Sequence, residues 1–263
     1  MKYFGGCDVG STYTKTVILD EDGKIVAANT IKSKINSEER AKAGLEQALS
    51  EAGLKEVSDL TYLIGTGYGR NKVAQADENI SEISCHAMGV HVTDPSVQAI
   101  IDIGGQDVKG IAVDTDGTVK TFAMNDKCAA GTGRFFESMA NAFELSLEEF
   151  SKLSLTAENV IPITAQCTVF AESEVITLVG EGKPRNEIAA GIQQAVAKRC
   201  FVMAKKAGAK DAITLTGGCA KNQGLKAAIE KVLRMKVIEL KTDPQLMGAL
   251  GAAEFARQKG LDL

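Results

Sequence analysis

The chain has 263 residues, of which 44% are apolar and only four are proline, and its formal net charge is -4. A chain of this length and apolar content can bury a core in one or two compact lobes, which excludes a disordered or low-complexity protein. Its lysines and arginines are scattered and its pI is near 5.4, so the basic patch of a nucleic-acid binder is missing. We therefore expect no nucleic-acid partner.

The N-terminal residues lead directly into a strand-like segment without an apolar signal core, and no run is long enough to span a bilayer. We therefore expect a cytoplasmic protein with no membrane partner. In that compartment cysteines are more often buried small residues, metal ligands or redox groups than disulfides. None of the cysteines forms a CxxC pair, so no self-contained zinc or ferredoxin-type site is predicted. The six are Cys7, Cys85, Cys128, Cys167, Cys200 and Cys219.

The first predicted element in chain order is an apolar strand that ends in Asp8-Val9-Gly10, and a segment that ends in Asp102-Ile103-Gly104 repeats it. In both copies a lysine follows the aspartate by seven residues, at Lys15 and Lys109, on a predicted second strand. The shared offset needs no gap. It favours an internal duplication over the alternative of two unrelated hairpins.

Each copy continues with an Asp-Gly pair, Asp22-Gly23 and Asp116-Gly117, which predicts a hairpin turn into a third strand. Helical patterns follow over residues 37–52 and 133–145. The sequence thus predicts an α/β protein of two duplicated β-β-β-α lobes, residues 1–95 and 96–263, with the last helix free to pack back on the first lobe. Such an arrangement places both Asp-x-Gly turns at the mouth of an interlobe cleft, where small ligands tend to bind.

The turns that end the repeated strands have the composition of a phosphate site. In the first copy, backbone N–H groups, hydroxyls and an ammonium are available to an anionic tail, from Gly10, Ser11, Thr12, Tyr13, Thr14 and Lys15. In the second copy, Gly104 and Gly105 allow close approach of the backbone to terminal phosphates. Asp8 and Asp102 are predicted to hold a hydrated Mg²⁺. Gln106 or Asp107 is the predicted residue that orients the attacking water.

A third turn follows a short apolar strand over residues 213–216, at Gly217-Gly218, where a nucleoside can pass close to the backbone. The P-loop pattern G-x-x-x-x-G-K-[ST] is missing from the sequence. Each turn alone is compatible with a plain tight turn. Three in this order resemble the phosphate-1, phosphate-2 and adenosine motifs of the superfamily of acetate and sugar kinases, heat-shock chaperones and actin. The resemblance implies an actin-like ATPase fold that holds ATP or ADP and couples its hydrolysis to lobe motion.

Two segments, 125–135 around Cys128 and 167–174 starting at Cys167, resemble the signature cysteine segments of the activase family of 2-hydroxyacyl-CoA dehydratases and benzoyl-CoA reductases. The resemblance extends over nearly the whole chain, through segments 66–70, 81–87, 102–107, Gln245 and 248–253. It implies that Cys128 and Cys167 ligate one [4Fe–4S] cluster shared by a homodimer, because two thiolates per chain supply only half of four ligands. It also implies that residues 11–15, Ala220 and Gln245 lie at the nucleotide.

The same resemblance implies an enzyme of anaerobic metabolism that couples ATP hydrolysis to one-electron transfer from reduced ferredoxin or flavodoxin to an iron–sulfur acceptor enzyme. The acceptor stays open between a dehydratase, a benzoyl-CoA reductase core and a double-cubane protein. Two alternatives are an actin-like small-molecule kinase without a metal cluster and a nucleotide-gated binding protein of chaperone or filament type.

The sulfurs of Cys128 and Cys167 are each predicted at a helix N-terminus, where the helix dipole stabilises negative charge.

The other residues with reactive side chains are expected to be structural. Glu172 and Glu174 are expected in the first turn of the helix that follows Cys167. The remaining four cysteines are expected to serve packing. Both histidines, His86 and His91, are expected to have a capped or hydrogen-bonded structural role.

Overall fold

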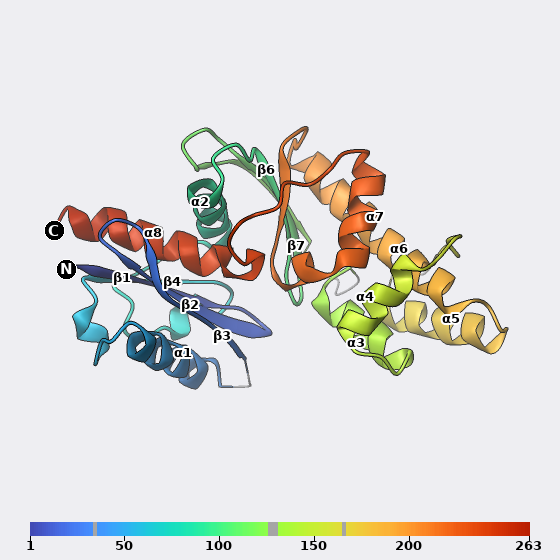
Figure 1. Ribbon diagram of the computed structural model, residues 1–263, viewed down its shortest axis with the longest axis horizontal. Helices are drawn as coiled ribbons and strands as arrows, with labels where there is room; N and C mark the ends of the chain where they lie inside the picture. The colour runs from blue at the N-terminus through green and yellow to red at the C-terminus, as the bar shows by residue number, and fades with distance from the viewer. Residues whose placement is uncertain (34–35, 126–130, 165–166) are drawn as a thin grey trace. The chain divides into compact units, whose positions relative to one another are not determined.

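The computed structural model describes residues 1–33, 36–125, 131–164 and 167–263 (Figure 1). The chain divides into two compact units. One comprises residues 1–98, 113–120 and 240–263, and the other comprises residues 99–112 and 121–239. Cys128 lies outside the described residues.

The first unit is built on a five-stranded sheet of order β3-β2-β1-β4-β5. The strands β1 (Tyr3–Val9), β2 (Tyr13–Asp20) and β3 (Ile25–Lys32) form an antiparallel meander. On the other side of β1, β4 (Tyr62–Thr66) and β5 (Glu78–Asn79) continue the sheet in parallel. The predicted hairpin turn between β2 and β3 is present, and Gly23 adopts the left-handed φ of +79° that such a turn requires.

The helices of this unit are α1 (Ser37–Glu51), α2 (Glu82–Thr93) and α8 (Met247–Leu261), with short 3₁₀ turns at Val57–Asp59, Arg70–Lys72 and Pro244–Leu246. The helix predicted over 37–52 is confirmed as α1. Its N-terminus is capped by the Asn36 side chain, which accepts from the Glu39 N–H at 3.3 Å. Its apolar face, Leu45, Ala48 and Leu49, is buried in a core with β1 and β2.

Backbone-to-backbone contact holds α8 in place. A Cβ on Gly251 of α8 would lie 1.8 Å from the Cys85 carbonyl oxygen of α2, and a Cβ on Gly6 of β1 would lie 2.1 Å from the Ala249 carbonyl oxygen of α8. Only glycine permits such close approach at these two positions. The C-terminal helix therefore joins α2 and β1 without intervening side chains.

The other sheet has the order β8-β7-β6-β9. It consists of β6 (Ala99–Ile103), β7 (Val108–Val113), β8 (Val119–Asn125) and β9 (Ile213–Thr216). Between β8 and β9 the chain forms α3 (Gly133–Ala142), α4 (Leu147–Leu155), α5 (Thr168–Gly180) and α6 (Arg185–Lys206). A 3₁₀ turn (Gly218–Lys221) and α7 (Gln223–Leu233) follow β9.

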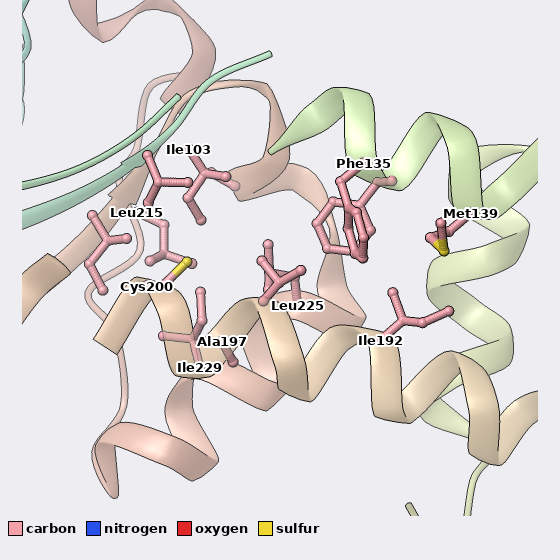
Figure 2. Close-up of a cluster of buried hydrophobic side chains, with 14 of the residues drawn as sticks. Ile103, Phe135, Met139, Ile192, Ala197, Cys200, Leu215, Leu225 and Ile229 are labelled. Atoms are coloured by element: carbon pink, nitrogen blue, oxygen red, sulfur yellow. The ribbon is translucent and has the colours of Figure 1, made fainter. Parts of the chain in front are cut away.

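One large apolar core joins this sheet to its helices. Figure 2 shows Ile103 and Leu215 from the strands facing side chains of α3, α6 and α7. Phe135 and Phe136, at the start of α3, are almost fully buried, and each such side chain contributes about 2–3 kcal/mol of hydrophobic stabilisation. The core therefore fixes the start of α3 against the sheet.

The sheets repeat each other in register. Asp8 pairs with Lys15 on one neighbouring strand and Thr66 on the other, while Asp102 pairs with Lys109 and Thr216. The strand, hairpin and lysine offsets of the predicted duplication are thereby confirmed. The duplication also includes a fourth strand, β4 in one copy and β9 in the other. The sequence predicted the strand at β9 but neither β4 nor the correspondence of the two.

One predicted helix is too long. The pattern over 133–145 predicted a helix to residue 145, but α3 ends at Ala142. Glu144 adopts a positive φ of +53°, and the Leu145 N–H turns back to the Ala140 carbonyl at 3.0 Å, which closes the helix end. Phe143 is still buried in the core, so the helical spacing of apolar residues continues beyond the last residue of the helix.

No helix in the described ranges is long and apolar enough to cross a lipid bilayer.

The Gly251 contact gives a stability test. Gly251→Ala should lower the free energy of unfolding by about 1–3 kcal/mol or more, because the added methyl group collides with the α2 backbone and cannot be relieved by a side-chain rotation. Gly180→Ala is the matched control, since a Cβ there meets nothing within 4 Å, and it should change stability by less than about 0.5 kcal/mol. Urea unfolding measures both, and equal effects would contradict the close packing of α8.

Candidate functional site

The β1–β2 turn is closed by its own backbone, with the Gly10 N–H donating to the Tyr13 carbonyl at 3.1 Å. A Cβ on Gly10 would lie 2.9 Å from that carbonyl oxygen and 3.1 Å from Lys15 Nζ, so the turn has no room for a side chain. Ser33, from the end of β3, donates its backbone N–H to the Thr12 carbonyl at 2.8 Å and its hydroxyl to the Gly10 carbonyl at 3.0 Å. The turn is thus fixed from two sides.

The side chains of this turn include a cation and a hydroxyl suited to an anion. Lys15 Nζ lies 2.7 Å from Asp8 Oδ2. Thr12 Oγ1 is buried and has no hydrogen-bond partner among the described residues. A buried hydroxyl without a partner is costly unless a ligand supplies one. A close backbone, an ammonium and a spare hydroxyl together fit a phosphate group.

The β6–β7 turn has the same backbone closure, with the Gly104 N–H donating to the Asp107 carbonyl at 3.0 Å. Its charges differ. Lys109 Nζ lies 3.2 Å from Asp102 Oδ2 and 2.9 Å from Asp107 Oδ1. Gln106 is exposed at the tip of the turn. Of the two predicted water-orienting residues, one faces solvent and the other has its carboxylate paired with a lysine.

The carboxylates of Asp8 and Asp102 each lie directly against a glycine that follows the fourth strand of their sheet, β4 or β9. Gly67 and Gly217 adopt positive φ angles of +88° and +83°. A Cβ on Gly67 would lie 2.4 Å from Asp8 Oδ1, and one on Gly217 would lie 2.9 Å from Asp102 Oδ1. Of these two glycines, sequence reasoning assigned only Gly217 to the site. Gly67 could have been found from the Thr-Gly pair that occurs at both 66–67 and 216–217.

Two further predicted nucleotide residues lie on short 3₁₀ turns. Ala220 is 9% exposed and donates its N–H to the Gly217 carbonyl at 3.2 Å, in the turn that includes Gly218. Gln245 is buried, and its N–H donates to Asp243 Oδ1 at 2.9 Å. Ala220 belongs to the second unit and Gln245 to the first.

His86 lies close to the aspartate of the first unit. A Cβ on Gly248, at the start of α8, would meet Asp8 Oδ2 at 2.8 Å and His86 Nε2 at 2.9 Å. His86 itself is buried on α2. Sequence reasoning gave this histidine a capped or hydrogen-bonded structural role and missed its proximity to Asp8, because β1, α2 and α8 come together only in the folded chain.

Cys167 differs from the other described cysteines. It is exposed and forms the N-cap of α5, as predicted. The Thr168 hydroxyl directly behind it is buried without a partner among the described residues. A thiol at an exposed helix N-terminus is accessible to a metal and lies beside the free N–H groups of the first helical turn. These features fit a metal–sulfur ligand, although no group of three or more potential metal ligands comes together within the described parts of the chain.

The remaining described cysteines have the features of packing residues. Burial raises the pKa of the Cys7 and Cys85 thiols to about 12, against a small lowering by hydrogen bonds from Thr16 and Thr66. Burial also raises the pKa of Cys219 to about 12 and that of Cys200 still further. The predicted packing role of Cys7, Cys85 and Cys200 agrees with their complete burial.

The expected location of Glu172 and Glu174 is wrong. The helix α5 begins at Thr168, so its first turn ends at Ala171 and contains no acidic residue. Glu172 Oε2 accepts instead from the Ser138 hydroxyl of α3 at 2.6 Å, and Glu174 Oε1 accepts from the Thr164 N–H at 3.0 Å. Glu172 therefore joins two helices.

The β6–β7 turn is connected to α3 by two backbone hydrogen bonds. The Gly133 N–H donates to the Gly104 carbonyl at 2.9 Å, and the Arg134 N–H donates to the Gly105 carbonyl at 3.0 Å. Both N–H groups lie in the first turn of α3, where backbone N–H groups have no carbonyl partner within the helix. A continuous set of hydrogen bonds therefore runs from the turn through α3 and Ser138 to α5, whose N-cap is Cys167.

The sequence and the fold of this chain were compared with those of known proteins, and both match ATPases. The sequence pattern of the BadF/BadG/BcrA/BcrD ATPase family matches residues 6–256. The chain belongs to that family. Within this ATPase family, the activator of lactoyl-CoA dehydratase from Anaerotignum propionicum is 46% identical over 254 residues, 97% of each chain. One of the subunits of benzoyl-CoA reductase from Thauera aromatica is 31% identical, over 96% of this chain and 92% of its own.

Solved structures of relatives in the ATPase family share the fold. Component A of (R)-2-hydroxyglutaryl-CoA dehydratase from Acidaminococcus fermentans superposes with a TM-score of 0.94 at 40% identity, over 99% of this chain and all of its own. The activator of 2-hydroxyisocaproyl-CoA dehydratase from Clostridium difficile, with bound ADPNP, gives 0.92 at 41% identity, over 99% and 96%. A glucokinase from Streptomyces griseus, at 15% identity and a TM-score of 0.58 over 97% and 99%, shares the fold alone. The predicted actin-like ATPase fold is confirmed.

The cysteine environments give a labelling test on iron-free native protein. We expect iodoacetamide to modify Cys167 readily, and Cys7 and Cys85 at least about a thousandfold more slowly at pH 7. The reason is that a pKa near 12 leaves very little thiolate at that pH, and burial blocks access. Peptide mass spectrometry assigns each site, and unfolding in urea should make the rates equal. Similar rates in native protein would contradict the described burial.

Proposed function

We propose that this protein is an ATP-driven activator that delivers one electron at low potential to an iron–sulfur acceptor enzyme acting on an acyl-CoA. It is a homodimer, bound to Mg²⁺ and ATP or ADP, in which Cys128 and Cys167 of both protomers hold one [4Fe–4S] cluster. The donor is reduced ferredoxin or flavodoxin, which loses one electron. The acceptor gains that electron, and ATP is hydrolysed to ADP and phosphate.

Family membership and the named activities of the relatives support this proposal. Relatives that act with 2-hydroxyacyl-CoA dehydratases are more similar than the relative from benzoyl-CoA reductase, which favours a dehydratase as the acceptor. The cluster, when bound, accepts and releases single electrons. Its midpoint potential changes by about 60 mV for 1.4 kcal/mol, so several hundred millivolts correspond to about 5–10 kcal/mol, within reach of ATP hydrolysis.

The observation that carries the proposal is the hydrogen bonding between the Gly104-Gly105 turn and the first turn of α3. Gly104 and Gly105 are the proposed contacts of the terminal phosphates, and the chain from Cys128 enters α3 a few residues later. Displacement of the turn is transmitted to α3, because the Gly104 and Gly105 carbonyls of the turn accept hydrogen bonds from N–H groups at the start of α3. The Ser138–Glu172 bond carries the displacement on to α5 and Cys167.

A cysteine substitution tests the cluster directly. Cys167→Ser should reduce iron and sulfide from about four each per dimer to near zero in protein purified without oxygen, because a ligand from each protomer is lost. Binding of ADP should persist, since Cys167 is absent from the phosphate turns. Cys85→Ala is the control, as it removes a buried thiol without this role.

Two outcomes contradict the proposal. Retention of full iron by Cys167→Ser would exclude this cysteine as a ligand. A pale, iron-free native protein that phosphorylates a small hydroxyl or carboxyl compound would establish the small-molecule kinase instead.

The proposed coupling has its own test. Ser138→Ala should leave ATP turnover within about twofold but lower the electrons delivered per ATP about tenfold, because a bond to a charged group worth about 1.5 kcal/mol or more joins α3 to α5. Ser96→Ala is the matched control. It removes a 2.6 Å hydroxyl-to-carboxylate bond to Asp94 outside this pair of helices, and it should change neither quantity. Unchanged electron delivery in Ser138→Ala would exclude this route.

A further inference from the structure

The duplicated lysines differ in their surroundings. Lys15 Nζ contacts one carboxylate, Asp8 at 2.7 Å, and a backbone carbonyl, that of Tyr13, at 3.4 Å. Lys109 Nζ contacts two carboxylates, Asp102 at 3.2 Å and Asp107 at 2.9 Å. Asp107 stands where the first copy has Tyr13, five residues after the central aspartate. The exchange of a tyrosine for an aspartate gives the second lysine its additional partner.

The difference changes the charge that each turn presents. Asp8 and Lys15 together are neutral, and the Lys15 side chain is 12% exposed. Asp102, Asp107 and Lys109 together have a net charge of -1, and the Lys109 side chain is only 3% exposed. A neutral group with an accessible ammonium favours a phosphate anion, whereas a buried ammonium between two carboxylates leaves a group that favours a hydrated cation.

The geometry around Lys109 is closely determined. Asp102 Oδ1 also accepts from the Thr216 hydroxyl at 2.9 Å. The Asp107 carboxylate folds back over the turn, so that a Cβ on Gly104 would lie 2.4 Å from its Oδ1. The Lys109 ammonium is the contact shared by both carboxylates. Without it, a buried and a partly buried negative charge would repel each other at the end of one strand and the start of the next.

We propose that Lys109 is a positioning residue that fixes Asp102 and Asp107 for a hydrated Mg²⁺, while its duplicated counterpart Lys15 is the lysine that binds phosphate. The inference rests on the proposed ATPase function and assigns different tasks to two lysines at equivalent positions. Lys109 does not contact the nucleotide. Its effect on hydrolysis is exerted through the two carboxylates.

Paired substitutions to methionine test this division of tasks. Titration of each protein with ADP, in EDTA and in MgCl₂, gives the dissociation constants, and MgCl₂ titration of ATP hydrolysis gives the half-saturating Mg²⁺ and kcat. Lys15→Met should weaken ADP binding in EDTA about tenfold or more, because it removes a charge-assisted hydrogen bond. Lys109→Met should keep that affinity within about threefold. It should lower kcat about tenfold and also lower the half-saturating Mg²⁺, because the carboxylate charge is then uncompensated.

The outcomes are distinguishable. A loss of metal-free ADP affinity in Lys109→Met equal to that in Lys15→Met would overturn the proposal and make both lysines phosphate ligands. A lowered melting temperature with unchanged Mg²⁺ dependence and kcat would also overturn it, since Lys109 would then be structural only. If Lys109→Met does not fold, Asp107→Asn removes one carboxylate and should raise the half-saturating Mg²⁺ severalfold; an unchanged value would refute the inference. Failure of the unsubstituted protein to bind ADP or hydrolyse ATP would overturn the proposed function itself.

Discussion

A buried aspartate at the end of a central strand is the constraint on which both halves of the protein depend. Asp8 and Asp102 are each 3% exposed, and an uncompensated carboxylate at such a position is strongly unfavourable. Each is compensated by a lysine from one neighbouring strand and confined by a glycine at the end of the other. These contacts require the β-meander, the parallel fourth strand and the left-handed turn after it to be formed together.

Much of the fold was predictable because the duplication keeps these contacts at constant sequence offsets. Asp-x-Gly, the lysine seven residues later and the Asp-Gly hairpin report local register, which the chain encodes within a few residues. The strand β9 was predicted from its apolar run, but β4 was not, and the two were not recognised as counterparts because residues 126–212 separate β8 from β9 while residues 33–61 separate β3 from β4, so no constant offset relates them. The end of α3 was misplaced because Phe143 is buried although Glu144 has left the helix. Burial and helix continuation diverge at that point.

The candidate site likewise has features that could be predicted from the sequence and features that could not. Its turns and the exposed Cys167 at a helix start follow from short motifs, since glycine, hydroxyl and cysteine positions are set locally. The contacts between distant segments do not follow from the sequence. They include His86 beside Asp8 through Gly248, Ser138 bonded to Glu172, and the Gly104 carbonyl accepting from Gly133. Each depends on packing of whole helices, which no residue spacing records. Cys128 lies outside the described residues, so its role stays a prediction.

In the second copy of the repeat, the helices α3 to α6 lie between the third and fourth strands of the sheet, where the first copy has α1 and a short 3₁₀ turn. Because β8 and β9 are fixed by the sheet, both ends of this insert are held in place whatever lies between them. The insert can therefore change in length and sequence, and adapt to different protein surfaces, while the strand pairing that places Asp102 is preserved. A two-copy nucleotide-hydrolysing frame has in this way one long connection, between β8 and β9, that is open to diversification, and one short connection, between β3 and β4, that offers less sequence for it.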